Sequence, residues 1–187
     1  MHTFESILTA AQAGAEWAWR VLYDEYFRTL VGYFRVQGGR DPEDLAGDVL
    51  LRMSRTIGTF EGTESKFRSW IFTIAHNRLI DERRQRTRRP EQPEAEPPEQ
   101  VDPSATDDVV LERAGTAWVV EALDLLSADQ REVLTLRIIN GFTIPEIAGV
   151  TGRGIGAVKQ LQRRGLRRVS KHFGSHPYPD NHSERSR

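Results

Sequence analysis

The chain has 187 residues, of which 38% are hydrophobic and 28% charged, and its 26 basic and 27 acidic side chains give a net charge of −1. This length allows one ordinary domain or two small ones. Because the chain contains no cysteine, disulfides, thiolate chemistry and Cys-based zinc sites are excluded, which suits a reducing cytoplasm. No apolar run approaches the roughly 18 residues of a membrane span, and the start MHTFESILTA lacks the features of a secretory signal.

The charges are distributed unevenly along the chain. Residues 1–89 carry 14 basic and 12 acidic side chains, residues 90–112 carry eight acidic and no basic ones, and residues 113–187 carry 12 basic and seven acidic ones. The middle segment therefore masks two flanking regions with a basic excess. It includes PEQPEAEPPEQVDPSATDD, which has five prolines and almost no apolar side chains, a composition that predicts a flexible acidic linker.

This linker divides the chain into predicted units. Residues 1–89 and 113–170 are predicted to form two small helical domains, joined by the linker at residues 90–112. The polar residues 171–187 are predicted to be a disordered tail.

The first flanking region shows helical patterning. In residues 20–36, apolar and aromatic side chains recur with a period close to 3.6 residues. Gly38 and Gly39 then break the chain, and Asp41 and Pro42 supply an N-cap and a first helical position for the next helix. No segment of the chain alternates with period two for long enough to predict a strand, so the predicted fold class is all-α.

A third helix is predicted from about residue 65 to residue 84. Its apolar side chains include Phe67 and Trp70, and basic side chains lie off the apolar face. Aromatic rings between basic side chains can stack on unpaired bases while arginine holds the backbone. The spacing alone favours the alternative, in which these two rings belong to the hydrophobic core.

Two amphipathic stretches open the second flanking region, at residues 118–126 and 130–139. Ser127 is placed to cap the second stretch, and Asn140-Gly141 is a helix stop.

Residues 142–169 then follow the spacing of a helix-turn-helix. Ala148 is the small residue that the first helix needs where the second crosses it. Gly152, four positions later, tolerates the positive φ of the turn. Ile147, Val158 and Leu161 are spaced to seat the second helix against the first.

The second helix of this motif is predicted from about residue 155 to residue 169, and it directs basic and amide side chains outward. Such side chains pair with base edges in the major groove or with phosphates. The alternative is a basic helix with merely solvated charges, but the helix-turn-helix spacing favours DNA contact. The outward side chains are Arg153, Lys159, Gln160, Arg163 and Arg164.

Two long sequence stretches resemble a known family. DPEDLAGDVLLRMSRTIGTF followed by SKFRSWIFTIAHNRLIDERRQR resembles region 2 of extracytoplasmic-function (ECF) sigma factors of the sigma-70 family. LSADQREVLTLRIINGFTIPEIAGVTGRGIGAVKQLQRRGLRRV resembles their region 4. The resemblance implies a sigma factor that binds core RNA polymerase and directs promoter-specific transcription initiation, and that is not an enzyme and needs no cofactor.

The resemblance also implies three sets of contact residues. The set for core polymerase is Asp41, Glu43, Asp44, Leu45, Asp48, Val49 and Arg52. The set for the melted −10 element is Phe60, Glu61, Lys66, Arg68, Ser69, His76, Asn77, Arg83 and Arg84. The set for the duplex −35 element is Arg153, Gly154, Ala157, Lys159, Gln160, Arg163 and Arg164.

The partners implied by the resemblance are core RNA polymerase, through its β′ clamp helices and β flap, promoter DNA and an anti-sigma factor. The linker is expected to run toward the RNA exit path. No small-molecule substrate, metal or membrane span is expected, and the expected localisation is cytoplasmic.

Two other function classes remain as alternatives. A stand-alone helix-turn-helix regulator would bind operators without polymerase and would leave residues 41–89 without a role. A helical interaction protein would make the helix-turn-helix spacing a coincidence. An enzyme is disfavoured, because the five histidines are scattered and no HExxH, GxSxG or phosphate-loop pattern is present.

Overall fold

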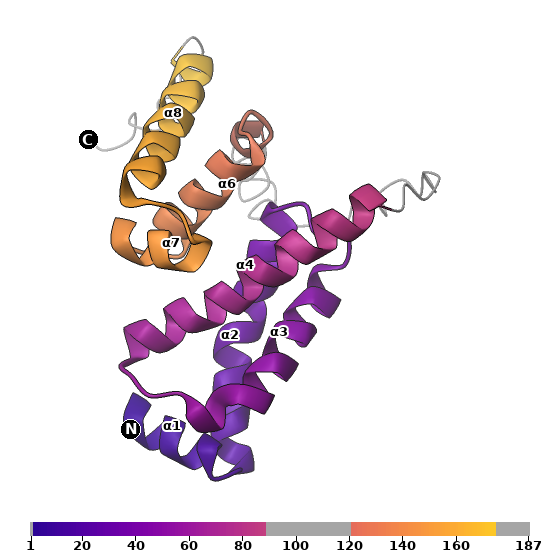
Figure 1. Cartoon of the computed structure of the whole chain (residues 1–187), viewed down its shortest axis with the longest axis vertical. Helices are drawn as coiled ribbons and strands as arrows, with labels where there is room; N and C mark the ends of the chain where they lie inside the picture. Colours follow the sequence, from indigo (N-terminus) through magenta and orange to yellow (C-terminus); the bar gives the residue numbers. More distant parts are fainter. Residues whose placement is uncertain (1, 89–120, 175–187) are drawn as a thin grey trace, which may run out of the picture.

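The computed structural model describes residues 2–88 and 121–174 (Figure 1). Every regular element in these ranges is a helix, which confirms the all-α prediction. The long helices are α1 (Phe4–Gln12), α2 (Glu16–Val36), α3 (Pro42–Thr56), α4 (Glu64–Arg88), α6 (Ala128–Leu134), α7 (Ile144–Thr151) and α8 (Ile155–Phe173). A 3₁₀ helix, η1 (Ile57–Thr59), and a π-helix, η2 (Thr135–Ile139), follow α3 and α6.

The turn between α2 and α3 follows from its sequence. Gly38 has a φ of 73°, which favours glycine, and a Cβ on Gly39 would lie 2.7 Å from Leu45 Cδ1, so a larger residue there would displace the Leu45 side chain. Asp41 then caps α3 by accepting a hydrogen bond from the backbone N–H of Asp44, and Pro42 stands in the first turn. The predicted start of α3 is confirmed.

An aromatic core joins α1, α2 and α4. The fully buried ring of Phe67 lies 5.3 Å from Phe4, 5.8 Å from Tyr26, 5.0 Å from Phe60 and 5.4 Å from Trp70. Edge-to-face and tilted pairs at these distances stabilise a core beyond the area that they bury. The core interpretation of Phe67 and Trp70 therefore holds in this structure.

The C-terminal half begins with a capped helix that ends differently from the prediction. Ser127 and Gln130 form a capping box at the start of α6. The predicted single helix over residues 130–139 is wrong in its last part, because the chain continues from Leu134 as the π-helix η2. This wider turn buries Leu136 and leaves Ile138 and Ile139 64% and 59% exposed.

The helix-turn-helix is formed by α7 and α8, as the spacing predicts. Thr143 and Glu146 make a capping box at the start of α7. Gly152 ends α7 with a φ of 65°, the left-handed conformation that the turn requires. Val158 is fully buried against the rest of the motif, and α8 continues to Phe173, beyond the predicted end near residue 169.

The two halves share one hydrophobic core, which runs from Leu8 to Val158. In Figure 1, α7 lies beside the N-terminal half of α4, and these helices pack against each other. The rings of Phe72 on α4 and Phe142 before α7 are 5.0 Å apart. The sequence did not predict this contact. The predicted linker (90–112) and residues 175–187 of the predicted tail lie outside the described residues.

In residues 2–88 and 121–174, no helix combines the length and the apolar character that crossing a bilayer requires.

Candidate nucleic-acid and polymerase interfaces

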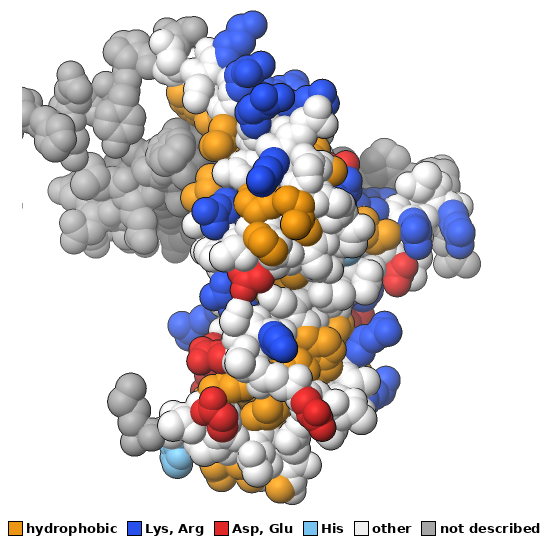
Figure 2. Space-filling view, turned by 60° about the vertical axis from the view of Figure 1, so that its left-hand side comes forward, with side chains coloured by type: hydrophobic (Ala, Val, Ile, Leu, Met, Phe, Trp, Pro, Cys, Tyr) orange, Lys and Arg blue, Asp and Glu red, His pale blue; other side chains and the backbone are white. Residues whose placement is uncertain are grey.

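Helix α8 carries a one-sided basic surface. It contains two lysines and four arginines and no acidic residue. Val158 and Gly165 are buried and fix the face that packs on the protein. Figure 2 shows basic side chains crowded at the upper end of the molecule, the end that α8 occupies in Figure 1. The exposed residues of the predicted −35 set are Gly154, Ala157, Lys159, Gln160, Arg163 and Arg164.

Arg153 differs from the rest of this set. Its guanidinium donates to the carboxylate of Asp129 at 2.7 Å, and its side chain is only 31% exposed. The Nε of Arg153 is buried and finds no hydrogen-bond partner among the described residues. In this structure an acid on α6 holds the Arg153 side chain toward the protein, and its contact with the −35 element stays a prediction.

The predicted −10 set lies along α4 and the loop before it. Four of its members are exposed and two are half-buried at the rim of the aromatic core. The exposed members are Glu61, Lys66, Asn77 and Arg84. The half-buried members are Phe60 and Ser69.

The remaining three members of that set are engaged inside the protein. Arg68 donates to the backbone carbonyl of Asn140 at 2.8 Å and lies 4.4 Å above the ring of Phe142. Arg83 donates to the backbone carbonyl of Gln37 at 3.1 Å. His76 is only 8% exposed. Arg68 and His76 therefore contact or face the C-terminal half and cannot reach DNA in this arrangement.

Glu132 is a buried carboxylate between the two halves. Its Oε1 accepts a hydrogen bond from the Tyr33 hydroxyl at 2.6 Å and lies 2.6 Å from Nδ1 of His76. Burial alone raises the pKa of Glu132, but the hydrogen bond and charge of His76, the Tyr33 hydroxyl and Arg83 together lower it below its ordinary value. Burial and the neighbouring carboxylate raise the pKa of Tyr33. Glu132 is thus held as a carboxylate by side chains of α2 and α4.

The predicted polymerase-binding helix, α3, presents only part of its predicted set. Leu45 and Val49 are 2% and 1% exposed. They pack in the core, where they position the helix, and their contact with polymerase stays a prediction. The members of the set that lie at the surface are Asp41, Glu43, Asp44, Asp48 and Arg52.

Two of these surface acids are paired. Asp48 accepts from Arg78 of α4 at 2.7 Å, and Glu43 accepts from Arg35 of α2 at 2.8 Å. Both pairs lie at or near the surface, where such bridges contribute little to stability. The two ion pairs hold the Glu43 and Asp48 side chains of α3 in defined positions.

In residues 2–88 and 121–174, no three His, Asp or Glu side chains gather closely enough to hold a metal ion.

The sequence matches two family models, in the order that the resemblance implied. Sigma-70 region 2 matches residues 22–89, and Sigma-70, region 4 matches residues 116–169. The ECF RNA polymerase sigma factor SigX of Bacillus subtilis is 30% identical over 168 residues, 84% of either chain. This chain belongs to the ECF sigma factors of the sigma-70 family.

A second relative agrees with this assignment. The ECF RNA polymerase sigma factor BldN of Streptomyces coelicolor is 36% identical over 169 residues, which is 88% of this chain and 64% of the length of BldN. The chain thus spans somewhat less than two thirds of BldN.

Two solved structures share the fold. A structure of CnrH in complex with the cytosolic domain of CnrY aligns with a TM-score of 0.65 at 23% identity, covering 91% of this chain and 97% of the other. The sigma factor RpoE from Bartonella quintana, in complex with the anti-sigma factor NepR, aligns with the same TM-score and identity, covering 84% of this chain and 98% of the other.

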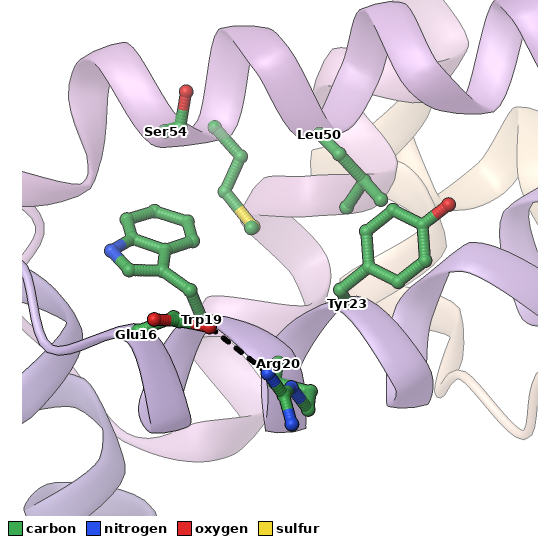
Figure 3. A pocket seen from close by; sticks show the side chains of 7 residues that line it. Glu16, Trp19, Arg20, Tyr23, Leu50 and Ser54 are labelled. Atoms are coloured by element: carbon green, nitrogen blue, oxygen red, sulfur yellow. Dashed lines mark hydrogen bonds and ion pairs between the residues drawn. The ribbon is translucent and has the colours of Figure 1, made fainter.

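Region 2 of this sigma factor has an apolar surface that the sequence reasoning missed. Leu51 on α3 is 50% exposed, beside the surface acids. In the same region, an open pocket of about 400 Å³ lies between α2 and α3 (Figure 3). Trp19 and Tyr23 line it from α2, and Leu50 and Met53 line it from α3. The position of Leu51, off the stripe that contains Met53, was the signal that could have identified it.

Proposed function

We propose that this sigma factor binds core RNA polymerase through α3 and directs it to promoters, reading the −35 element with α8 and the −10 element with α4 and residues 59–64. The basic exposed face of α8, on a helix-turn-helix in the same chain as region 2, carries the proposal. The chain acts by positioning polymerase, so its role includes no covalent chemistry, and it acts in the cytoplasm, where the polymerase is.

The −35 contact is proposed to come from the N-terminal part of α8. Lys159, Gln160 and Arg163 are exposed on its surface. Arginine, lysine and glutamine pair with guanine or adenine in the major groove, and the remaining basic side chains neutralise phosphates. Gly154 and Ala157 are small, which lets the start of the helix approach the bases closely.

The −10 contact is proposed to come from α4. Lys66, Asn77 and Arg84 are exposed on this helix, and residues of this kind hold the backbone of a single strand. The proposed role of Arg68 and His76 requires that region 4 move away from α4.

The polymerase contact is proposed to involve both halves. On region 2, Leu51 and the neighbouring pocket supply an apolar centre, and Asp48 and Arg52 supply charges around it. Such a centre with a polar rim is the common form of protein interfaces. On region 4, the exposed Ile138 and Ile139 suit an apolar contact with the β flap.

An anti-sigma factor is the further partner that we propose. The solved relatives CnrH and RpoE are each bound to another protein, CnrY and the anti-sigma factor NepR. Their fold covers most of this chain, so a partner that engages both regions fits the same architecture.

The proposal is tested by run-off transcription with core polymerase that lacks any other sigma factor, on a pool of genomic promoters. We expect transcripts whose promoters share −35 and −10 motifs. The variant Leu51→Lys is expected to lose binding to core, and Leu51→Ala to weaken it, with unchanged melting temperatures because the side chain is exposed. A chain that binds DNA specifically but never binds core would instead be a stand-alone operator-binding regulator.

A further inference from the structure

The segment that joins α3 to α4, residues 57–63, buries few of its side chains. Ile57 is 3% exposed and Phe60 is half-buried, whereas residues 58, 59 and 61–63 are all exposed. A segment with so little buried apolar area opens easily unless hydrogen bonds hold it. Most of the loop that is proposed to read the −10 element, residues 59–64, belongs to this segment, so its shape depends on those bonds.

A side chain of α1 ties both ends of the 3₁₀ turn in this segment. The amide nitrogen of Gln12 donates to the backbone carbonyl of Ile57 at 3.0 Å and to that of Phe60 at 2.9 Å. A side-chain amide has two N–H donors, so one nitrogen serves both carbonyls. Ile57 begins η1 and Phe60 follows its last residue. Gln12 therefore fixes the entry and the exit of the turn together.

Helix α1 is a firm support for this anchor. Its residues Leu8 and Ala11 are buried, and the ring of Phe4 lies 5.3 Å from that of Phe67. The ring of Phe60 lies 5.0 Å from the same Phe67 ring. In Figure 1, α1 lies at the lower end of the molecule beside the segment between α3 and α4, and the two are in contact. The anchor and the loop are thus seated on one part of the core.

The chemistry of α1 does not suit direct contact with DNA. Its sequence FESILTAAQ contains one acidic residue and no basic one, so it offers no cation to a phosphate. Both N–H donors of the Gln12 side chain are directed at backbone carbonyls of the loop. An effect of Gln12 on DNA would therefore pass through the loop.

We propose that Gln12 is a positioning residue for −10 recognition, which holds residues 59–64 in the conformation that discriminates among bases. This inference rests on the proposed function of that loop. A preformed loop binds without an ordering cost and does not rearrange around a wrong base. Loss of the anchor is expected to lower base discrimination by about 5-fold, the effect of roughly one net hydrogen bond.

The anchor is first measured without DNA, by amide hydrogen exchange on the full chain. Gln12→Met keeps an unbranched side chain and removes both N–H donors. The N–H of Phe60, which donates to the Ile57 carbonyl at 3.0 Å, is expected to exchange about 5-fold faster or more in this variant. Thr9→Ala is the matched control, because Thr9 is an exposed residue one turn earlier on α1, and it is expected to exchange like wild type.

Base discrimination is then measured by run-off transcription with core polymerase, on one promoter from the genomic pool and on its single-base variants. Gln12→Met is expected to reduce the ratio between the original promoter and its −10 variants by about 5-fold. The corresponding ratio for −35 variants and the affinity for core are expected to stay unchanged. Gln12→Lys supplies N–H donors on a long side chain and is expected to restore the −10 ratio. A loss of stability alone would lower all transcripts and leave both ratios as they are.

Equal exchange of the Phe60 N–H in wild type and Gln12→Met would overturn the anchor. Faster exchange with an unchanged −10 ratio would make Gln12 a structural residue only and would overturn its positioning role. A wild-type chain that yields no transcripts would remove the promoter function and, with it, the role of Gln12 in reading DNA. The exchange measurement separates that failure from a failure of the anchor itself.

Discussion

The guanidinium of Arg153 and the carboxylate of Asp129 lie 2.7 Å apart, and this ion pair ties the turn before α8 to the first turn of α6. Arg153 precedes the helix that is proposed to read the −35 element. The pair therefore links the turn to α6, and we propose that Arg153 acts as a positioning residue whose effect on DNA passes through the helix.

Removing either member of this pair is predicted to have the same effect. Arg153→Ala and Asp129→Ala should each lower the free energy of unfolding by about 0.5–1 kcal/mol, since the pair is partly exposed and screened by solvent. Each should also weaken −35 duplex binding without changing the preferred bases. Urea unfolding and anisotropy on a set of single-base variants of the site measure both effects. A change of base preference in Arg153→Ala alone would make Arg153 a base reader.

The exposed basic residues of α8 should behave differently from Arg153. Arg164→Ala is predicted to weaken duplex binding similarly on all sequences and to reduce the salt-dependence slope by about 1, if it neutralises one phosphate. Arg163→Ala is predicted to relax specificity at one position, at a cost of about 1–3 kcal/mol. Titrations at several salt concentrations, with Arg168→Ala near the far end of the helix as the control, separate the two roles.

Local chemistry made much of the fold predictable. Asp41 before Pro42 predicted the start of α3, and Ser127 predicted that of α6, because an N-cap acts within its own first turn. The spacing from Ala148 to Gly152 predicted the helix-turn-helix because a tight turn leaves few residue choices.

Contacts between distant residues were not predictable in the same way. Tyr33 and Glu132 are 99 positions apart, and no periodic pattern in either helix indicates that an acid on α6 will be buried. The same holds for Arg153, whose partner Asp129 lies 24 positions away. The position of Arg153 just before α8 therefore predicted contact with DNA, whereas in this structure its guanidinium pairs with the carboxylate of Asp129.

Close packing inside region 4 gives a further prediction, at Gly165. A Cβ at this position would lie 2.9 Å from Cδ1 of Leu134, whose side chain is 5% exposed. Gly165→Ala should therefore separate α8 from α6 and lower the free energy of unfolding by about 1–3 kcal/mol.

The control for that change is Gly149→Ala. A Cβ there meets no atom within 4 Å among the described residues, so the variant should be stabilised by up to about 1 kcal/mol through helix propensity. Urea unfolding compares the two variants, and equal stabilisation of both would show that α8 and α6 can move apart without cost.

The buried carboxylate of Glu132, beside Tyr33 and His76, also predicts how stability depends on pH. The pKa of Glu132 lies below its ordinary value of 4.5 in the folded chain, because the opposing burial is outweighed by His76, Tyr33 and Arg83, the titratable and charged groups that face it from α4 and α2. A carboxyl group with a lowered pKa contributes stability above the pKa of the unfolded chain and loses it as the pH falls through the folded value. Wild type should therefore lose stability as the pH falls below about 4.5.

Glu132→Gln separates this effect from those of other carboxyl groups. Glu146, whose pKa is lowered by hydrogen bonds from Ser65 and Thr143, titrates in the same direction in both proteins and cancels in the comparison. Urea unfolding between pH 3 and pH 7 should thus give a steeper acid loss for wild type than for Glu132→Gln, which carries no carboxyl group at position 132. Parallel curves for the two proteins would mean that Glu132 keeps an ordinary pKa, and that the carboxylate does not hold the two halves together.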